Sequence, residues 1–119
     1  MTGKLSGGIW VCRPVSEEPE SLLRDWHVFE VQLPCWASRT RHFAGTVGRW
    51  GEGRVSSRVI TFDTTTVRGI TDSGRVYELR RPQGFTLDAQ YTFARWLRIN
   101  AAMDVVDVSR EIYVPSTKT

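Results

Sequence analysis

The chain is poor in cysteine, in lysine and in long apolar runs. Its two cysteines, Cys12 and Cys35, are too few for a disulfide framework. No apolar run approaches the roughly 20 residues that a membrane-spanning helix needs. Residues 1–8 also lack the apolar stretch of a secretory signal. These absences predict a cytoplasmic protein that does not contact a membrane.

Residue patterns for metal binding and catalysis are also missing. Cys12, His27, Cys35 and His42 make up the inventory of a zinc site, but they lack the closely spaced cysteine pair that such sites use. The glycines of residues 48–53 match no dinucleotide-binding pattern, and the lysine of a nucleotide loop is absent. We therefore predict no metal, no cofactor and no catalytic residue.

A small enzyme with an unfamiliar site is the alternative to a binding protein. A deep pocket that brings Cys35 to His42, or Asp104 to Tyr113, would favour this alternative. The spacing of Asp104 and Asp107 places them on opposite faces of a strand, which argues against a carboxylate pair.

The composition is that of one folded domain. The chain has 119 residues, of which 40% are hydrophobic, and its 13 aromatic residues include five tryptophans. Large rings supply much buried area, so a core without cross-links is expected. We predict a single domain over residues 1–119, with flexible ends at residues 1–8 and 115–119.

Positive charge is concentrated in the middle of the chain. Residues 36–81 contain nine arginines and four acidic residues, which gives a balance of +5, whereas the whole chain carries +3. Fourteen of the sixteen basic residues are arginine, whose planar guanidinium group suits carboxylates, phosphates and aromatic faces. Codon bias in a GC-rich genome explains this preference over lysine equally well, but it does not explain the clustering.

Hydrophobic patterning predicts several short strands and one helix. Residues 26–33 alternate, with His27, Phe29, Val31 and Leu33 on the apolar face. The other predicted strands are residues 9–11, 40–47, 54–62, 105–108 and 112–114. The acidic run at residues 16–20 is expected to be a solvated loop.

The strongest local signals are a hairpin and a helix. Residues 67–71 and 75–79 flank the sequence Asp-Ser-Gly, which is typical of a hairpin with a left-handed glycine at position 74. Residues 87–100 form an amphipathic helix with Thr86 as its N-cap and Asn100 as a left-handed stop. The predicted fold class is α+β and mainly antiparallel β. We expect a small bent sheet or SH3-like barrel, covered by this helix in the C-terminal half of the chain.

Arginine and tryptophan alternate in the central segment. Basic groups beside indoles suit single-stranded nucleic acid, and the same residue types dominate the centres of protein–protein interfaces. Trp50, which lies between glycines in a turn, is expected to be exposed. The predicted binding surface comprises Trp36, Arg39, Arg41, His42, Arg49, Trp50, Arg54 and Arg58.

Several segments resemble small uncharacterised proteins of proteobacterial mobile elements, namely plasmids, integrative elements and phages. The similarity covers roughly residues 26–110. It is carried by GRVSS at residues 53–57, TDSGRVYEL at 71–79, DVS at 107–109, and by Asp88, Ala89, Trp96 and Asn100. The resemblance implies a transfer accessory or an inhibitor of host defence, including anti-CRISPR-like proteins, and it assigns no functional residues.

The leading hypothesis is a non-enzymatic binding protein of a mobile element that inhibits or modulates a nucleoprotein complex. Its expected partner is a protein or a nucleoprotein complex. Direct binding of nucleic acid, in regulation or transfer, is the second hypothesis. The two hypotheses differ in salt dependence, because binding to phosphates weakens steeply as salt concentration rises.

Overall fold

The computed structural model describes residues 5–6, 9–10, 13–80 and 83–112. Near the N-terminus, the short strands β1 (Leu5–Ser6) and β2 (Ile9–Trp10) pair with each other. The predicted strand at residues 9–11 is thus present at Ile9 and Trp10, and Val11 lies outside the described residues. The predicted flexible end at residues 115–119 lies outside them as well, as do residues 1–4 and 7–8.

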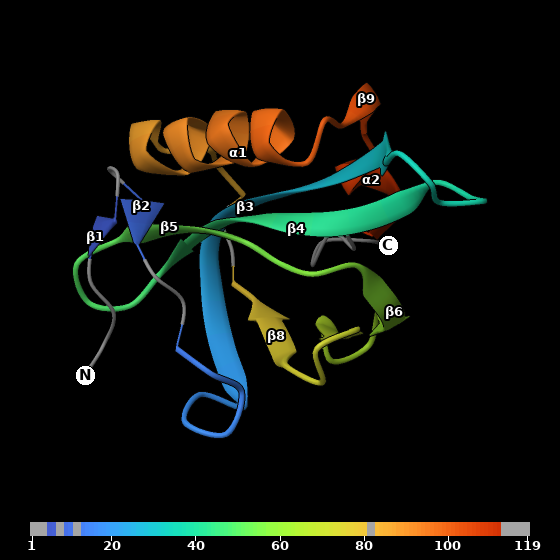
Figure 1. The fold of residues 1–119 in the computed structure, drawn as a ribbon. Coiled ribbons are helices and arrows are strands. Elements are labelled where there is room, and N and C mark those ends of the chain that lie inside the picture. Colours follow the sequence, from blue (N-terminus) through green and yellow to red (C-terminus); the bar gives the residue numbers. More distant parts are fainter. Residues whose placement is uncertain (1–4, 7–8, 11–12, 81–82, 113–119) are drawn as a thin grey trace.

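A single long strand, β3 (Glu20–Gln32), runs through the whole sheet (Figure 1). Its first half pairs in parallel with β8 (Val76–Leu79), and its second half pairs with β4 (Thr40–Val47) and β9 (Met103–Asp107). Asp25 has a φ of 47°, and the register with β4 shifts between Arg24 and His27. The strand therefore bends at Asp25, and its two halves belong to two arms of the sheet.

Both faces of the second half of β3 contribute to the core. Phe29, Val31 and Leu33 are buried as predicted, and His27 is half-buried. Val28, on the opposite face, is fully buried too. The expectation of a half-buried strand was therefore wrong at this residue, because the two arms of the bent sheet enclose a second apolar cluster.

Two apolar clusters lie on opposite sides of the sheet. One fills the bend between the two arms and consists of Leu23, Trp26, Val28, Phe43, Val47, Tyr77, Leu79 and Val108. The other lies between the sheet and the main helix and consists of Phe29, Ala44 and Phe93, with Val55, Phe85, Trp96 and Leu97 packed against it. The aromatic residues of the sequence thus serve mainly to join the layers.

The remaining strands extend the two arms. Six strands of the seven-stranded sheet follow the order β5-β4-β3-β8-β7-β6, and the seventh, β9, pairs with β3 beside this path. The strands not yet named are β5 (Glu52–Val55), β6 (Val59–Asp63) and β7 (Arg68–Thr71). The strand predicted at residues 54–62 is in fact two strands. Ser56 causes the break, because its backbone N–H donates to Phe43 O (2.8 Å) while its Oγ accepts from Phe43 N (2.9 Å). Beyond this point the chain leaves β4 and crosses to the other arm.

The predicted hairpin and helix are both present. In the turn between β7 and β8, Gly74 has a φ of 92° and its N–H donates to Thr71 O (2.8 Å). Helix α1 (Leu87–Ile99) starts at Thr86, whose hydroxyl accepts from Ala89 N (3.1 Å). Asn100 has a φ of −94°, so it is not the predicted left-handed stop; that conformation is adopted by Ala101, at 51°.

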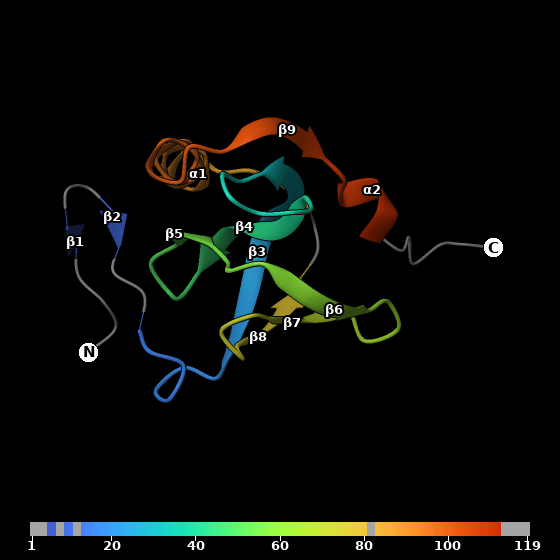
Figure 2. The same ribbon diagram turned by 45° about the vertical axis from the view of Figure 1, so that its right-hand side comes forward.

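Helix α1 lies across β5 and β4 on one side of the sheet (Figure 1). The following β9 arches past the helix to α2 (Ser109–Ile112), as Figure 2 shows. Of the strand predicted at residues 112–114, Ile112 belongs to α2, and the other two residues lie outside the described ones. The fold class is thus α+β with a mostly antiparallel sheet. The sheet is open, so of the two predicted architectures the bent sheet is the correct one.

Candidate functional site

The residues predicted to bind a partner are distributed along both ends of β4. Trp36, Arg39 and Arg41 lie at its start, whereas Arg49 and Trp50 lie in the turn that follows its last residue. A strand of eight residues spans roughly 23 Å at about 3.3 Å per residue. The predicted residues therefore do not form one continuous surface.

His42 is buried and is not part of any surface. Only 3% of the residue is exposed, and its ring lies 4.6 Å from the ring of Trp96. Its Nε2 lies 2.7 Å from Thr40 Oγ1, and its Nδ1 lies 3.0 Å from Ser56 O. Burial lowers the pKa of His42, and the hydrogen bond with Ser56 offsets only part of this effect. His42 is a core residue, contrary to the sequence prediction.

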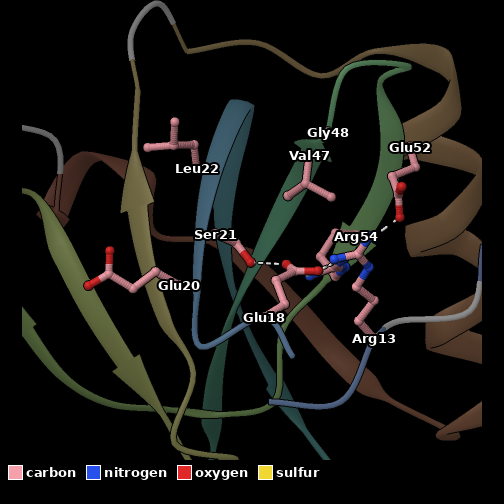
Figure 3. A pocket seen from close by; sticks show the side chains of 9 residues that line it. All are labelled: Arg13, Glu18, Glu20, Ser21, Leu22, Val47, Gly48, Glu52 and Arg54. Carbon is pink, nitrogen blue, oxygen red and sulfur yellow. Dashed lines mark hydrogen bonds and ion pairs between the residues drawn. The ribbon is translucent and has the colours of Figure 1, made fainter. Parts of the chain in front are cut away.

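Arg54 is buried as well, and it belongs to an internal ion network (Figure 3). Its side chain is 5% exposed and donates to Glu18 Oε2 (3.1 Å), while its Nη2 lies 3.7 Å from Glu52 Oε1. The acidic run at residues 16–20 was predicted to be a solvated loop, but its Glu18 faces inward to neutralise this guanidinium group. A buried cation needs such a partner. Arg54 is therefore not available to an external partner.

The network of Arg54 borders a pocket of about 270 Å³. Burial raises the pKa of Glu18, but hydrogen bonds from Arg54 and Ser21 and the charges of Arg54 and Arg75 outweigh this effect and lower it overall. Burial also raises the pKa of Glu52, and here the attraction of Arg54 does not compensate. Pairs of carboxyl groups with divergent pKa values are typical of acid–base sites. In this pocket, however, burial raises the pKa of Glu52 and buried arginines lower the pKa of Glu18, so both shifts follow from the packing of the fold.

Trp50 and Arg49 form an exposed pair in the turn between β4 and β5. Trp50 is 78% exposed, as the glycine-flanked turn predicted. The guanidinium carbon of Arg49 lies 5.6 Å from the centre of its ring, within the range of a cation–π contact. Gly48 and Gly51, with φ values of 78° and 70°, give the turn the left-handed conformations that leave the indole outside.

Three of the predicted arginines do lie close together, near the start of β4. Arg39, Arg41 and Arg58 line a groove of about 350 Å³ between the start of β4 and strand β6, which we call the arginine groove. Among its charged lining residues are three arginines and one glutamate, which gives the groove a balance of +2. The groove is lined by Glu30, Ser38, Arg39, Thr40, Arg41, Arg58, Val59, Ile60, Thr61 and Phe62.

Glu30 positions two of the three arginines. Arg39 Nε donates to one carboxylate oxygen (2.7 Å) and Arg41 Nε to the other (2.9 Å). Hydrogen bonds from Arg39 and Arg41 lower the pKa of Glu30, so the carboxylate stays charged. Arg41 also donates to the exposed Glu111 (2.7 Å). The two guanidinium groups are thereby held in place before any ligand arrives.

Arg58 is the third arginine of the groove, and it is the least well satisfied. Its guanidinium carbon lies 5.0 Å from the centre of the Trp36 ring. The nearest acidic group is Asp72, 53% exposed, with a nitrogen–oxygen distance of 3.7 Å. Its Nε is buried and has no hydrogen-bond partner within the described part of the chain. Arg58 therefore retains donor capacity beside a 42% exposed indole.

Sequence reasoning missed two features of the arginine groove. One is Glu30, which is not among the predicted binding residues. The register of β3 with β4 pairs Glu30 directly with Arg41, and the opposite charges at these positions are a signal that a hairpin alignment would have found. The other is β6, which was merged with β5 in the prediction.

Of the two residue pairs that would favour an enzyme, the described one, Cys35 and His42, is not assembled. Cys35 is exposed, whereas both ring nitrogens of the buried His42 are occupied by Thr40 and Ser56, so His42 is not a base for Cys35. Tyr113 lies outside the described residues, as does Cys12. Among the residues that are described, no three His, Cys, Asp or Glu side chains are grouped closely enough to hold a metal ion.

Neither helix of the described segments has the length and apolar character that crossing a membrane requires. Comparison with known proteins finds no family model, no curated protein and no solved structure that matches this chain. The arginine groove, with its two prearranged guanidinium groups and the under-bonded Arg58 beside Trp36, is therefore the candidate functional site on geometry alone.

Proposed function

We propose that this protein is a non-enzymatic binding protein that occupies a surface of a protein or nucleoprotein partner through the arginine groove and Trp36. The observation that carries the proposal is the 39% exposed side chain of Arg58, which lies over the exposed indole of Trp36. Its ion pair with the exposed Asp72 is long, at 3.7 Å, and such a pair contributes little. A partner that supplies a carboxylate or a phosphate can therefore bind the outer nitrogens of Arg58.

The proposed role is inhibition or modulation of the partner by occlusion. A binding surface with preorganised side chains loses little conformational freedom when it docks, and Glu30 provides this preorganisation for Arg39 and Arg41. The choice of a nucleoprotein complex in the cytoplasm as the target rests on the sequence resemblance to small proteins of mobile elements. Inhibition of a host-defence complex by occlusion, as by anti-CRISPR-like proteins, is one form of this proposed role.

The test is capture of a partner from a bacterial lysate by the immobilised protein, with variants at the groove. Trp36→Ala and Arg58→Gln should each reduce capture of a specific partner by about tenfold, since residues of these types dominate interface energetics. Arg98→Gln, at an exposed position in the last turn of α1, changes the same charge elsewhere and should have no effect. Equal capture by all four proteins would refute the proposal.

Direct binding of single-stranded nucleic acid is the second candidate, and the pair of Arg49 and Trp50 favours it. An exposed indole is a stacking platform for a base, and the adjacent guanidinium group can bind a phosphate. Titration with single- and double-stranded DNA at two salt concentrations tests this function. Trp50→Ala should weaken binding to single strands, and the affinity should fall steeply with salt. Binding that is absent at both salt concentrations would eliminate it.

A further inference from the structure

The arginine groove runs along the unpaired edge of β6. The groove is lined by Val59, Ile60, Thr61 and Phe62, four of the five residues of β6, so it follows the length of the strand. The register of β6 with β7 shifts between Val59 and Thr61, where the strand is irregular. Among the described strands, β6 ends the order of the sheet and pairs with β7 alone. The backbone groups on its other side therefore face the groove.

An unpaired edge of this kind is a template for a further strand. Ile60 in β6 is 47% exposed, and β6 lies beneath the starting half of β4 in the open sheet (Figure 1). The order β5-β4-β3-β8-β7-β6 ends without closure at this position. A strand bound in the groove would pair with β6 and extend the arm that now ends there.

We propose that the arginine groove binds an extended, acidic peptide segment of the partner, which adds to β6 as a further strand. This inference rests on the proposed binding function and specifies its ligand. Strand addition draws affinity from main-chain hydrogen bonds and specificity from alternate side chains. Because β6 has five residues, the matching segment is about five or six residues long.

The charge of the groove selects for carboxylates in that segment. The groove has three guanidinium groups and one carboxylate, Glu30, which binds Arg39 and Arg41 but not Arg58. The two other acidic partners, Glu111 and Asp72, are 59% and 53% exposed, and ion pairs at such positions contribute little. Acidic side chains of a bound strand can therefore take over these pairs, at every second position of the segment. Arg58 gains most, since its ion pair with Asp72 is the longest of the three arginines' pairs, at 3.7 Å.

A peptide suits this site better than a nucleic acid does. Beyond the irregularity at Ile60, the edge of β6 offers N–H donors and C=O acceptors, which match the backbone of a peptide and not a chain of phosphates. The acids that flank the groove also weaken its attraction for a polyanion, whereas a segment with a few carboxylates needs only local pairing.

The experiment measures fluorescence anisotropy of three dye-labelled synthetic hexapeptides with the full chain. The first alternates valine and glutamate, the second alternates valine and lysine, and the third is the first with methylated backbone nitrogens. The glutamate peptide should bind, the lysine peptide should not, and N-methylation should weaken binding by at least about tenfold because it removes the main-chain donors. Arg58→Gln and Arg41→Gln should each weaken binding about tenfold, and Arg98→Gln should leave it unchanged. Circular dichroism and urea unfolding verify that each variant is folded.

Three results would overturn the inference. Undiminished binding of the N-methylated peptide would exclude strand addition, and equal binding of the lysine peptide would exclude selection for acids. Absence of peptide binding, together with partner capture that still depends on Trp36 and Arg58, would overturn the inference and leave the proposed function standing. If capture too is independent of these residues, both fail.

Discussion

The side chain of Glu18 is shared by two buried arginines, and the variant Glu18→Gln removes its charge while preserving its shape. Its Oε2 accepts from Arg54 Nη1 at 3.1 Å and lies 3.8 Å from Arg75 Nη1. The hydroxyl of Ser21 donates to the same oxygen. Both arginine side chains are 5% exposed, so neither can turn to water when the carboxylate is replaced.

The expected loss of stability follows from this burial. Removing one partner of a buried ion pair costs about 3–5 kcal/mol, because the other charge is left uncompensated. Two features reduce the loss here. Glu18 is 20% exposed, and Glu52 remains 3.7 Å from Arg54 as a second carboxylate. Glutamine also keeps one oxygen as an acceptor. We therefore expect Glu18→Gln to lower the free energy of unfolding by about 2–3 kcal/mol at neutral pH.

Urea denaturation of the wild type and of Glu18→Gln, at several pH values, measures this effect. Because the pKa of Glu18 in the folded protein is below its ordinary value of 4.5, its contribution is complete above that ordinary value and is lost as pH falls through the folded pKa. The difference between the two proteins should accordingly shrink in acid. The exposed neighbour Glu17 provides the control, since Glu17→Gln makes the same chemical change outside the network. If Glu18→Gln loses no more stability than this control at neutral pH, the buried charges do not depend on Glu18 and the prediction is wrong.

Two further predictions concern the residues next to Arg54. Burial raises the pKa of Glu52, so the contribution of this carboxyl group to stability is present below its unfolded pKa and is lost as pH rises through its folded pKa. Glu52→Gln should therefore raise the free energy of unfolding at neutral pH by up to about 1 kcal/mol. Urea denaturation should show that this gain vanishes in acid. Unchanged or lower stability at neutral pH would contradict it. At Gly53, an added Cβ would collide with the side chain of Thr92 and lie 2.7 Å from Asp88 O. Gly53→Ala should therefore lower the thermal unfolding midpoint and cost about 1–3 kcal/mol of stability by overpacking. An unaltered midpoint would show that α1 can move away from β5.

Only part of the binding surface could be predicted. Its residue types follow from the composition of the central segment, whereas their positions in space do not. Arginines and indoles in the central segment were visible as a cluster, and Trp36, Arg39, Arg41 and Arg58 do lie around one groove. The neighbouring Arg54 has the same chemistry, yet it is buried. Nothing local distinguishes it, because its partner Glu18 precedes it by 36 residues.

The split of the predicted strand at residues 54–62 has a similar origin. The patterning of one continuous strand is present in Val55, Val59, Ile60 and Phe62. Residue types alone do not show where the chain stops pairing with one strand and begins to pair with another. The change occurs at Ser56, through its backbone and side-chain hydrogen bonds with Phe43 on β4. β5 therefore ends before Ser56 because of the position of β4, which the local sequence does not reveal.

Elements whose stabilising contacts are near in the chain could be predicted from local patterning. Gly74 closes its hairpin with Thr71, and Thr86 caps the helix at Ala89, each within three residues. The bend of β3, its parallel pairing with β8 and the burial of Arg54 could not be predicted in this way. These features depend on contacts between residues far apart in the sequence, where the gain from packing and charge pairing must exceed the entropy lost in closing long loops. Local patterning carries no information about that balance.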